Sequence, residues 1–458
     1  MSIISRRQML KTVSGGFGYM AFAGMCAQAS ADFENPLAPK VTHLAPRAKR
    51  VIFLCMRGGP SHVDTFDHKP QLQKDDGKKS TAAYNGKGGR KLMASPWKFK
   101  RHGESGLPIS ELFPNVAKHA DDLCLLNSMY ADIPNHPQAY IQLHTGDFRF
   151  VRPSVGAWTL YGLGTENQDL PGFITISPES RVGGAQNYGS SFLPAIYQGT
   201  RIGQLGRPLS QARIGNLANS QLTSDLQRQQ LDLVQEMNRE LLAQQKRNDE
   251  LEGIIESYEL AFRMQSAIPE VMDLTNETAA TLTAYGVDQK ATDDFGRQCL
   301  LARRFAESGV RYIELCHGNW DQHGSLKARL TANCKATDQP IAALIADLKQ
   351  RGMLDETLIV WGGEFGRTPH AKKPDGRDHN ASGFSMWMAG GGVKGGMRCG
   401  STDEYGINAT ENKMHFHDLH ATMLHLLGLD HKQLTYRYAG RDFRLTDVYG
   451  RVVKEIIA

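Results

Sequence analysis

The chain has 458 residues, of which 40 % are hydrophobic and 22 % are charged, and this composition is typical of a globular protein with a sizeable core. Its net charge of +5 includes Arg6, Arg7 and Lys11 near the N-terminus, and without these three residues 50 basic side chains face 48 acidic ones, a net charge of +2. Because there is also no basic stripe with interleaved aromatic residues, we expect no nucleic-acid partner.

Residues 1–29 are predicted to be an export signal. Arg6 and Arg7 lie in a twin-arginine pattern, a weakly apolar Gly/Ala-rich segment follows, and Ala27-Gln28-Ala29 resembles a cleavage site. An ordinary secretory leader or an uncleaved anchor is the alternative. Twin-arginine export carries proteins that fold, often around a cofactor, before they cross the membrane.

We therefore expect a periplasmic or secreted protein whose partner during export is the twin-arginine translocase. No other segment approaches the ~20 apolar residues that are needed to span a bilayer, so no stable membrane span is expected after cleavage.

The rest of the chain, residues 30–458, is predicted to form one α/β domain. Strand-like apolar runs alternate with helical patterns, and this alternation favours a parallel or mixed sheet with helices on both faces. Strands are predicted at 51–56, 122–127, 310–315 and 357–361, and helices at 135–143, 295–307, 344–350 and 421–427.

One segment departs from this alternation. Residues 225–264 have a highly charged helical pattern with an intermittent apolar face, which indicates a helical insertion near 205–275. A helical hairpin that mediates dimerisation is the main alternative. Residues 69–91 are polar and rich in Gly and Lys, and we expect a flexible loop there.

Six cysteines follow the export signal. Cys55 and Cys124 lie within apolar runs and are expected to fill the core. The chain has no Cys-x-x-Cys pair, which argues against a thiolate zinc site. An oxidising compartment permits a disulfide among the other four, which are Cys299, Cys316, Cys334 and Cys399.

Carboxylates and histidines gather just after the predicted strands. Because parallel strands end at one edge of their sheet, we expect these side chains to converge. Such mixed ligands suit zinc, manganese or iron, whereas carboxylates alone favour magnesium or calcium. The groups are His62/Asp64, Asp132/His136, His317/Asp321/His323, Glu364 with Asp378/His379, and the run from His415 to His420.

Each group also has a purely structural interpretation. A single histidine in a chain with 16 of them is more often a surface or hydrogen-bonded residue than a ligand. Asp418 is suited to cap the helix that follows it, and Glu364 and Arg367 are close enough in sequence to form an internal ion pair. The position of the groups after strands is what favours a site.

Several segments resemble a known family. Residues 56–64, 152–158, 363–369 and 418–422 are similar to the exported bacterial proteins of domain-of-unknown-function family 1501, which are often labelled sulfatase-like. The resemblance implies the alkaline phosphatase superfamily. It therefore implies a three-layer α/β/α sandwich with a mostly parallel central sheet, and hydrolysis of phosphate or sulfate esters at a metal site.

The chain departs from the superfamily pattern at the metal motif. Glu364 and Phe365 stand where the superfamily has an Asp-His pair, and Asp378-His379 are expected to restore the lost imidazole from the following loop. Asp321 and His323 resemble the ligand region ahead of a helix, and His415 or His417 lies where a late ligand histidine is expected.

The nucleophile is left open by the sequence. The resemblance places Asp132 at the position of the catalytic threonine, and Ser128 lies four residues before it. Either Ser128 attacks, or a metal-bound hydroxide does, or the site is not catalytic. No Cys/Ser-x-Pro-x-Arg motif for formylglycine is present, so the sulfatase label reflects the fold and does not define the chemistry.

The leading hypothesis is a periplasmic hydrolase that uses one or two divalent ions (zinc, manganese, calcium or magnesium) to cleave phosphate or sulfate esters of small molecules or glycans. Catalytic roles are assigned to Ser128, Asp132 and Arg367, the last of which is expected to stabilise developing negative charge. The alternative is a non-catalytic binding or assembly protein that retains the fold. The expected metal ligands are Asp64, Asp321, His323, Glu364, Asp378, His379 and His415.

Overall fold

The computed structural model describes residues 35–80, 89–212, 221–244 and 249–458. The predicted export signal at 1–29 lies outside these ranges. Among the helices of the described ranges, none is both long and apolar enough to cross a membrane.

A nine-stranded sheet forms the centre of the protein. Its strands read as continuous apolar runs because helices cover both faces: every residue of β1 is buried. Along the sheet the order is β12 (Met397–Cys399), β4 (Leu123–Tyr130), β11 (Phe384–Ala389), β8 (Thr357–Gly362), β1 (Arg50–Met56), β7 (Tyr312–His317), β5 (Phe173–Ile176) and β6 (Thr200–Ile202), and β15 (Met414–His415) also pairs with β4.

The sheet is mostly parallel, as the sequence predicts. In the middle, β1 pairs in parallel with β7 on one side and β8 on the other. Only β11 runs antiparallel to its neighbours β4 and β8. The carboxyl ends of β1, β7 and β8 therefore lie at one edge, and the loops that leave them start side by side.

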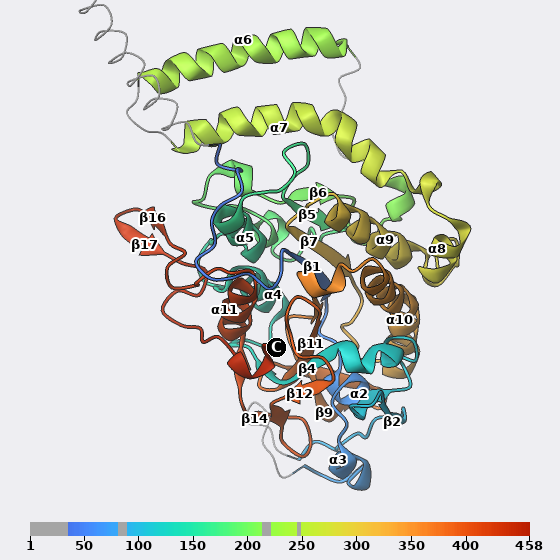
Figure 1. The fold of residues 1–458 in the computed structure, drawn as a ribbon. Coiled ribbons are helices and arrows are strands. Elements are labelled where there is room, and N and C mark those ends of the chain that lie inside the picture. The colour runs from blue at the N-terminus through green and yellow to red at the C-terminus, as the bar shows by residue number, and fades with distance from the viewer. Residues whose placement is uncertain (1–34, 81–88, 213–220, 245–248) are drawn as a thin grey trace, which may run out of the picture.

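Helices cover the two faces of this sheet and complete a three-layer α/β/α sandwich, which confirms the predicted fold class (Figure 1). One layer contains α4 (His136–Thr145), α5 (Val155–Leu163) and α11 (Phe416–Leu426), and the other contains α9 (Asp293–Glu307) and α10 (Leu326–Gln350). The predicted helix at 344–350 is the last part of the much longer α10.

Helix α4 begins and ends where local chemistry requires it. Pro137 lies in its first turn, where a missing backbone N–H costs nothing, and Gly146 ends it with a φ of +78°. A Cβ on Gly146 would lie 2.7 Å from the carbonyl oxygen of Leu445, so glycine is required there for steric reasons as well.

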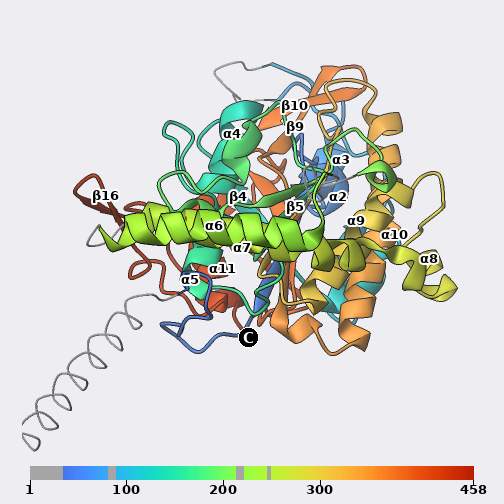
Figure 2. The same ribbon diagram turned by 90° about the horizontal axis from the view of Figure 1, so that it is seen from above.

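The expected helical insertion consists of α6 (Ser224–Ala243) and α7 (Asp249–Met272), which lie along each other beyond the end of the sandwich (Figures 1 and 2). Arg228 on α6 makes a bidentate ion pair with Glu259 on α7 at 2.8 and 3.0 Å. The outer face of α6 leaves Leu233 and Met237 more than half exposed.

The loop expected after residue 363 is instead an antiparallel hairpin of β9 (Gly366–Lys373) and β10 (Gly376–Asn380). Hydrogen bonds across this hairpin bring His379 opposite Arg367.

The remaining elements are α2 (His62–Thr65), α3 (Pro70–Lys74), α8 (Ala279–Ala284) and the strand pairs β2 (Phe99–His102) with β3 (Leu107–Ser110), β13 (Ser401–Thr402) with β14 (Ala409–Glu411), and β16 (Tyr436–Tyr438) with β17 (Arg441–Phe443).

All six cysteines in the described part of the chain are buried and have free thiols. The disulfide that an oxidising compartment would permit is therefore not formed in this structure.

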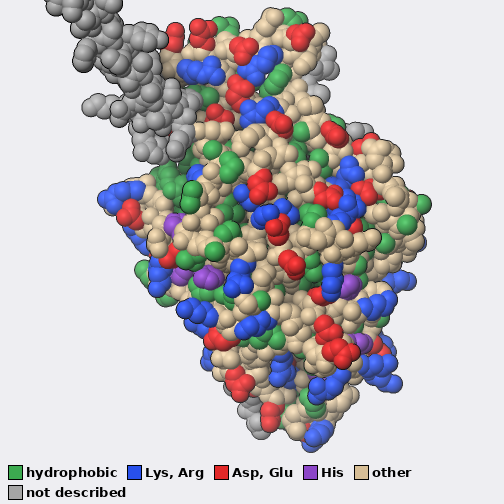
Figure 3. All heavy atoms as spheres, viewed as in Figure 1, with side chains coloured by type: hydrophobic (Ala, Val, Ile, Leu, Met, Phe, Trp, Pro, Cys, Tyr) green, Lys and Arg blue, Asp and Glu red, His purple; other side chains and the backbone are tan. Residues whose placement is uncertain are grey.

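On the face of the molecule drawn in Figure 3, basic and acidic side chains are interspersed without a continuous basic stripe.

Buried histidines make the fold sensitive to acid. His420 on α11 is 1 % exposed, and its Nε2 donates to the carbonyl oxygen of Leu143 on α4 at 2.8 Å. Burial lowers the pKa of His420 from 6.5 to about 3. Between these two values the unfolded chain binds a proton that the folded chain does not, so the free energy of unfolding falls as the pH falls.

We predict that His420→Gln reduces this acid sensitivity, because glutamine retains an N–H donor for Leu143 and does not titrate. The slope of unfolding free energy against pH between about 6.5 and about 3 should decrease by up to one proton, on the order of 1 kcal/mol per pH unit. Urea unfolding over a pH series measures it, with His102→Gln as the control, and an unchanged slope would contradict the prediction.

Candidate metal centre

The candidate site lies where the loops after β1, β7 and β8 meet the N-terminus of α4 and the β9–β10 hairpin. The loops carry Gly58, Asp321 and Glu364, and the helix carries His136. Gly58 has a φ of +118°, and a Cβ there would lie 2.6 Å from the backbone nitrogen of Asp321. Only glycine therefore allows the loop after β1 and the loop after β7 to pass this closely.

The Glu364 carboxylate is fully buried and links three of these segments. Its two oxygens accept the backbone N–H of Gly58 at 3.0 and 3.1 Å, and Oε1 accepts Nδ1–H of His136 at 2.6 Å. Burial alone would raise the pKa of Glu364, but the hydrogen bond and charge of His136 lower it below its ordinary value. Glu364 is therefore an ionised carboxylate that orients the imidazole of His136.

The proton on Nδ1 leaves Nε2 of a neutral His136 ring as an acceptor. This Nε2 lies 3.4 Å from Oδ1 of Asp321. It is buried and lacks a hydrogen-bond partner of good geometry among the described residues.

Two further imidazoles face the same carboxylate. Nδ1 of His323 lies 3.1 Å from the carbonyl oxygen of Arg377, and Nδ1 of His379 lies 2.9 Å from that of Pro134. Carbonyl oxygens only accept, so the proton of a neutral His379 ring is on Nδ1. Nδ1 of His323 also lies 3.0 Å from Nζ of Lys372, which only donates, so its carbonyl contact does not define the tautomer of that ring. The two Nε2 atoms are 2.9 Å apart, and they lie 3.0 and 3.5 Å from Oδ1 of Asp321.

These residues fit a divalent metal ion. A metal-bound histidine usually donates its other ring N–H to a carboxylate or a backbone carbonyl, and His136, His323 and His379 all have such an acceptor. Three imidazole nitrogens with one carboxylate are donors typical of zinc and related ions. Ligand atoms of His136, Asp321 and His379 lie within 4.8 Å of one another, as do those of His323, Asp378 and His379.

Arg367 holds Asp321 in place from behind. Its side chain is fully buried, and it donates to the carbonyl oxygens of Gly58 and Gly59 and to Oδ1 of Asp321 at 2.7 Å. Burial alone would raise the pKa of Asp321, but its contacts with the His136 and His379 rings and the charge of Arg367 hold it well below its ordinary value. Arg367 is therefore a positioning residue for Asp321, and its expected role in stabilising developing negative charge stays a prediction.

Exposed cations lie at the rim instead. Nζ of Lys372 is 3.0 Å from Nδ1 of His323 and 3.1 Å from Oδ1 of Asp378, and Nη1 of Arg90 is 3.1 Å from Oδ2 of Asp378. Both side chains are about one third exposed. Burial alone would raise the pKa of Asp378, but hydrogen bonds from Arg90 and Lys372 lower it to about 2.

Four predicted site residues, Asp64, Ser128, Asp132 and His415, lie elsewhere. Asp64 is fully buried in a bidentate ion pair with Arg377 at 2.6 and 2.9 Å, so its oxygens are directed at a guanidinium instead of the cluster. Ser128 lies in β4, and its hydroxyl donates to the carbonyl oxygen of Asn412 at 2.7 Å. The hydroxyl of Ser128 is buried and already hydrogen-bonded, which contradicts its predicted role as the nucleophile. His415 is paired with Asp132.

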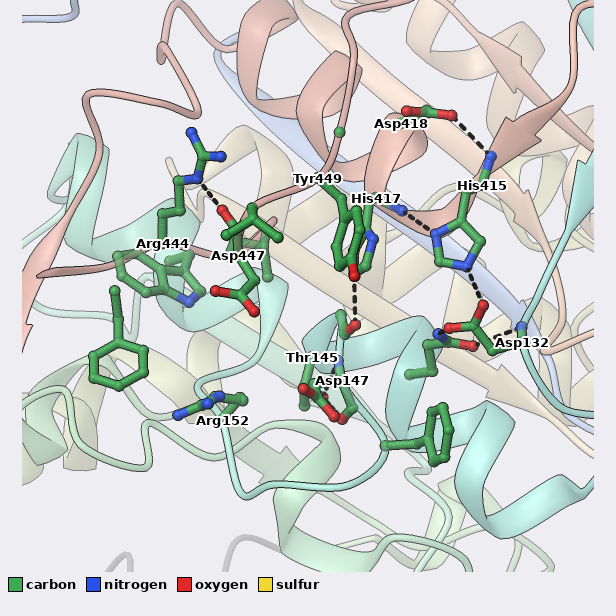
Figure 4. A pocket seen from close by; sticks show the side chains of 18 of the residues that line it. Asp132, Thr145, Asp147, Arg152, His415, His417, Asp418, Arg444, Asp447 and Tyr449 are labelled. Atoms are coloured by element: carbon green, nitrogen blue, oxygen red, sulfur yellow. Dashed lines mark hydrogen bonds and ion pairs between the residues drawn. The ribbon is translucent and has the colours of Figure 1, made fainter. Parts of the chain in front are cut away.

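Asp132 and His415 line a cavity of about 660 Å³ beside the C-terminal end of α4 (Figure 4). Nδ1 of His415 accepts the backbone N–H of His417 at 3.2 Å, so the proton of the neutral ring is on Nε2, which lies 3.3 Å from Oδ1 of Asp132. This contact is the main cause that lowers the pKa of Asp132 to about 2. Aromatic and arginine side chains form much of the wall, including Trp158, Phe443, Tyr449, Arg152 and Arg444.

The structure thus brings together six of the predicted residues, which are Asp321, His323, Glu364, Asp378, His379 and Arg367. The sequence-based ligand set missed His136, although the residue belongs to one of the groups that follow a strand. The sequence analysis also did not single out the rim residues Lys372 and Arg90. Isolated basic residues in polar segments are common on protein surfaces, so their positions in the sequence gave no indication of a role.

Comparisons with known proteins give several structural similarities and one family match. The chain is similar to a PsFucS1 sulfatase from Pseudoalteromonas sp. (15 % identity, 84 % of this chain and 68 % of that chain, TM-score 0.36), to the lipoteichoic acid synthase LtaP from Listeria monocytogenes (8 %, 91 % and 80 %, 0.36), and to the alkaline phosphatase from the Antarctic bacterium TAB5 (11 %, 83 % and 98 %, 0.32). No curated protein has a matching sequence. The family model described as "Protein of unknown function (DUF1501)" matches residues 48–457, and the chain therefore belongs to this family.

Proposed function

We propose that the protein is an exported, metal-dependent hydrolase of phosphate or sulfate esters. The observation that carries the proposal is the arrangement of three imidazoles around Asp321, each with its Nδ1 beside a carbonyl or carboxylate oxygen and its Nε2 within 3.5 Å of Oδ1 of Asp321. This arrangement is suited to hold a cation.

His136, His323, His379 and Asp321 are the residues that would hold the ion. A zinc-type ion supplies Lewis-acid chemistry, which polarises an ester and makes water more acidic. Glu364 and two backbone carbonyls orient the three imidazole rings through their Nδ1 atoms. Arg367 keeps Asp321 ionised and in place.

The rim residues provide for an anionic substrate. Lys372 and Arg90 present positive charge next to His323 and Asp378, where the oxygens of a phosphate or sulfate ester would be attracted. Ser128 is committed to Asn412 inside the sheet, so water is the proposed nucleophile.

We predict that His379→Ala removes the bound metal and the hydrolytic activity together. Metal content measured by elemental analysis should fall to background, and turnover of aryl phosphate, phosphodiester and sulfate esters should fall with it. Glu364→Gln retains the ligands but weakens the orientation of His136, so metal affinity should fall by roughly 10–100-fold.

His102→Ala is the matched control for loss of a histidine outside the cluster. A wild-type protein that binds no divalent ion, or a His379→Ala variant with full turnover, would contradict the proposed function. Metal binding with no turnover of any ester would favour the binding-protein alternative.

A second prediction concerns the positive charge of Lys372 at the rim of the centre. Lys372→Gln should raise KM for an anionic ester by about tenfold without loss of metal, because one charge-assisted contact is lost. Lys373→Gln is the control, since the neighbouring side chain on β9 is exposed on the opposite face. Equal steady-state kinetics for the two variants would exclude Lys372 from substrate binding.

Export is proposed from the sequence of residues 1–29. Replacement of Arg6 and Arg7 by lysine should leave the chain in the cytoplasm, because the twin-arginine pair is the recognised element. Cell fractionation followed by immunoblotting measures the distribution, and unchanged export of the double variant would indicate another route.

A further inference from the structure

A second group of metal-binding side chains lies inside the sandwich. Cys55 is on β1, Glu314 is on β7 and His144 is on the second half of α4, and none of the three is more than 2 % exposed. The strand register pairs Cys55 with Cys316 and Phe53 with Glu314. The side chains at these alternating positions therefore share the sheet face that α4 covers.

Hydrogen bonding defines the state of His144. Its Nδ1 lies 2.7 Å from the carbonyl oxygen of Tyr140, which only accepts, so Nδ1 carries a proton. Nε2 lies 3.2 Å from Oε1 of Glu314. A neutral imidazole and an ionised carboxylate would thus place two acceptors against each other, and either a second proton or a cation must lie between them.

A proton satisfies only part of this group. It would pair His144 with Oε1, but Oε2 of Glu314 is buried and has no hydrogen-bond partner among the described residues. A buried acceptor without a partner costs about 1–3 kcal/mol. A proton would also leave Cys55 outside the pair, with its thiol donating to the hydroxyl of Tyr140 at 3.4 Å, although Cys55, His144 and Glu314 have ligand atoms within 4.8 Å of one another.

A divalent cation satisfies all three side chains. A zinc-type ion about 2.0–2.1 Å from two donor atoms that are 3.2 Å apart subtends an angle of roughly 100° between them, close to the tetrahedral value. Its two positive charges would balance a Cys55 thiolate and the Glu314 carboxylate, which leaves the core neutral. The carbonyl of Tyr140 already holds the outer nitrogen of His144, as in known histidine metal sites.

We propose that Cys55, His144 and Glu314 form a buried structural site for a zinc-type divalent ion, with Oε2 of Glu314 as a fourth donor atom. The ion ties β1 and β7 to α4. It enters while the chain folds, because the ligands are inaccessible afterwards. This site is independent of the proposed hydrolase centre, which contains no cysteine and whose ligands are partly exposed.

The difference in exposure provides the test. The full mature protein, expressed with zinc, is dialysed against EDTA and analysed for metal. We expect the partly exposed centre to lose its ion and about one equivalent per chain to remain, released only when guanidinium is added with EDTA. X-ray absorption of the remaining zinc should show a sulfur ligand at about 2.3 Å.

Variants assign the ligand. In protein expressed with cobalt, a thiolate-to-cobalt absorption band should persist after EDTA treatment, disappear in Cys55→Ser and remain in Cys299→Ser, which alters an equally buried cysteine. Glu314→Gln should also lose the EDTA-resistant ion. The X-ray absorption measurement needs no variant and decides the question if Cys55→Ser does not fold.

Folded protein without an EDTA-resistant ion would overturn the proposal and identify His144 and Glu314 as a proton-bridged ion pair. A retained ion without a sulfur ligand would also overturn it. Neither result bears on the partly exposed centre, whose metal is measured before EDTA treatment.

Discussion

The buried carboxylate of Glu364 is the constraint on which the candidate centre depends. An ionised carboxylate with no exposed surface is stable only when its oxygens are fully hydrogen-bonded, because burial of an unpaired charge costs several kcal/mol. Gly58 and His136 supply these bonds from two segments that are far from Glu364 in sequence. The loop after β1, the loop after β8 and the start of α4 are therefore held in one arrangement.

Hydrogen bonds from distant segments also orient the three imidazoles. Each imidazole is oriented by an acceptor on a different element: Glu364 after β8, Pro134 before α4 and Arg377 in β10. Arg377 is itself held by Asp64, so an acid in α2 determines where the carbonyl that receives His323 lies. Asp64 thus supports the centre without belonging to it, and the polar groups behind the ligands form one connected network.

The position of α4 places two candidate metal-binding groups in different environments. Its first residue, His136, reaches the edge of the sheet where the side chains are partly exposed, whereas His144, two turns later, faces the middle of β1 and β7. The two groups therefore differ in exposure. An ion bound at the edge would be accessible to chelators, and an ion bound between the layers would be isolated from them.

The sequence by itself determined the fold class, the main strands and the segments that carry the centre. These features depend on local patterns: continuous apolar runs require a sheet covered on both faces, and polar residues after such runs lie at its edge. Only the tertiary structure decided which acids face histidines and which face an arginine. Asp64 and Asp321 both follow strands, yet Asp64 is paired bidentately with a guanidinium 313 residues away, whereas Asp321 faces three imidazoles. The β9–β10 hairpin, the role of His136 and the grouping of Cys55 with Glu314 were also beyond local patterns, because the direction of a lone pair is set by partners that only the folded chain brings together.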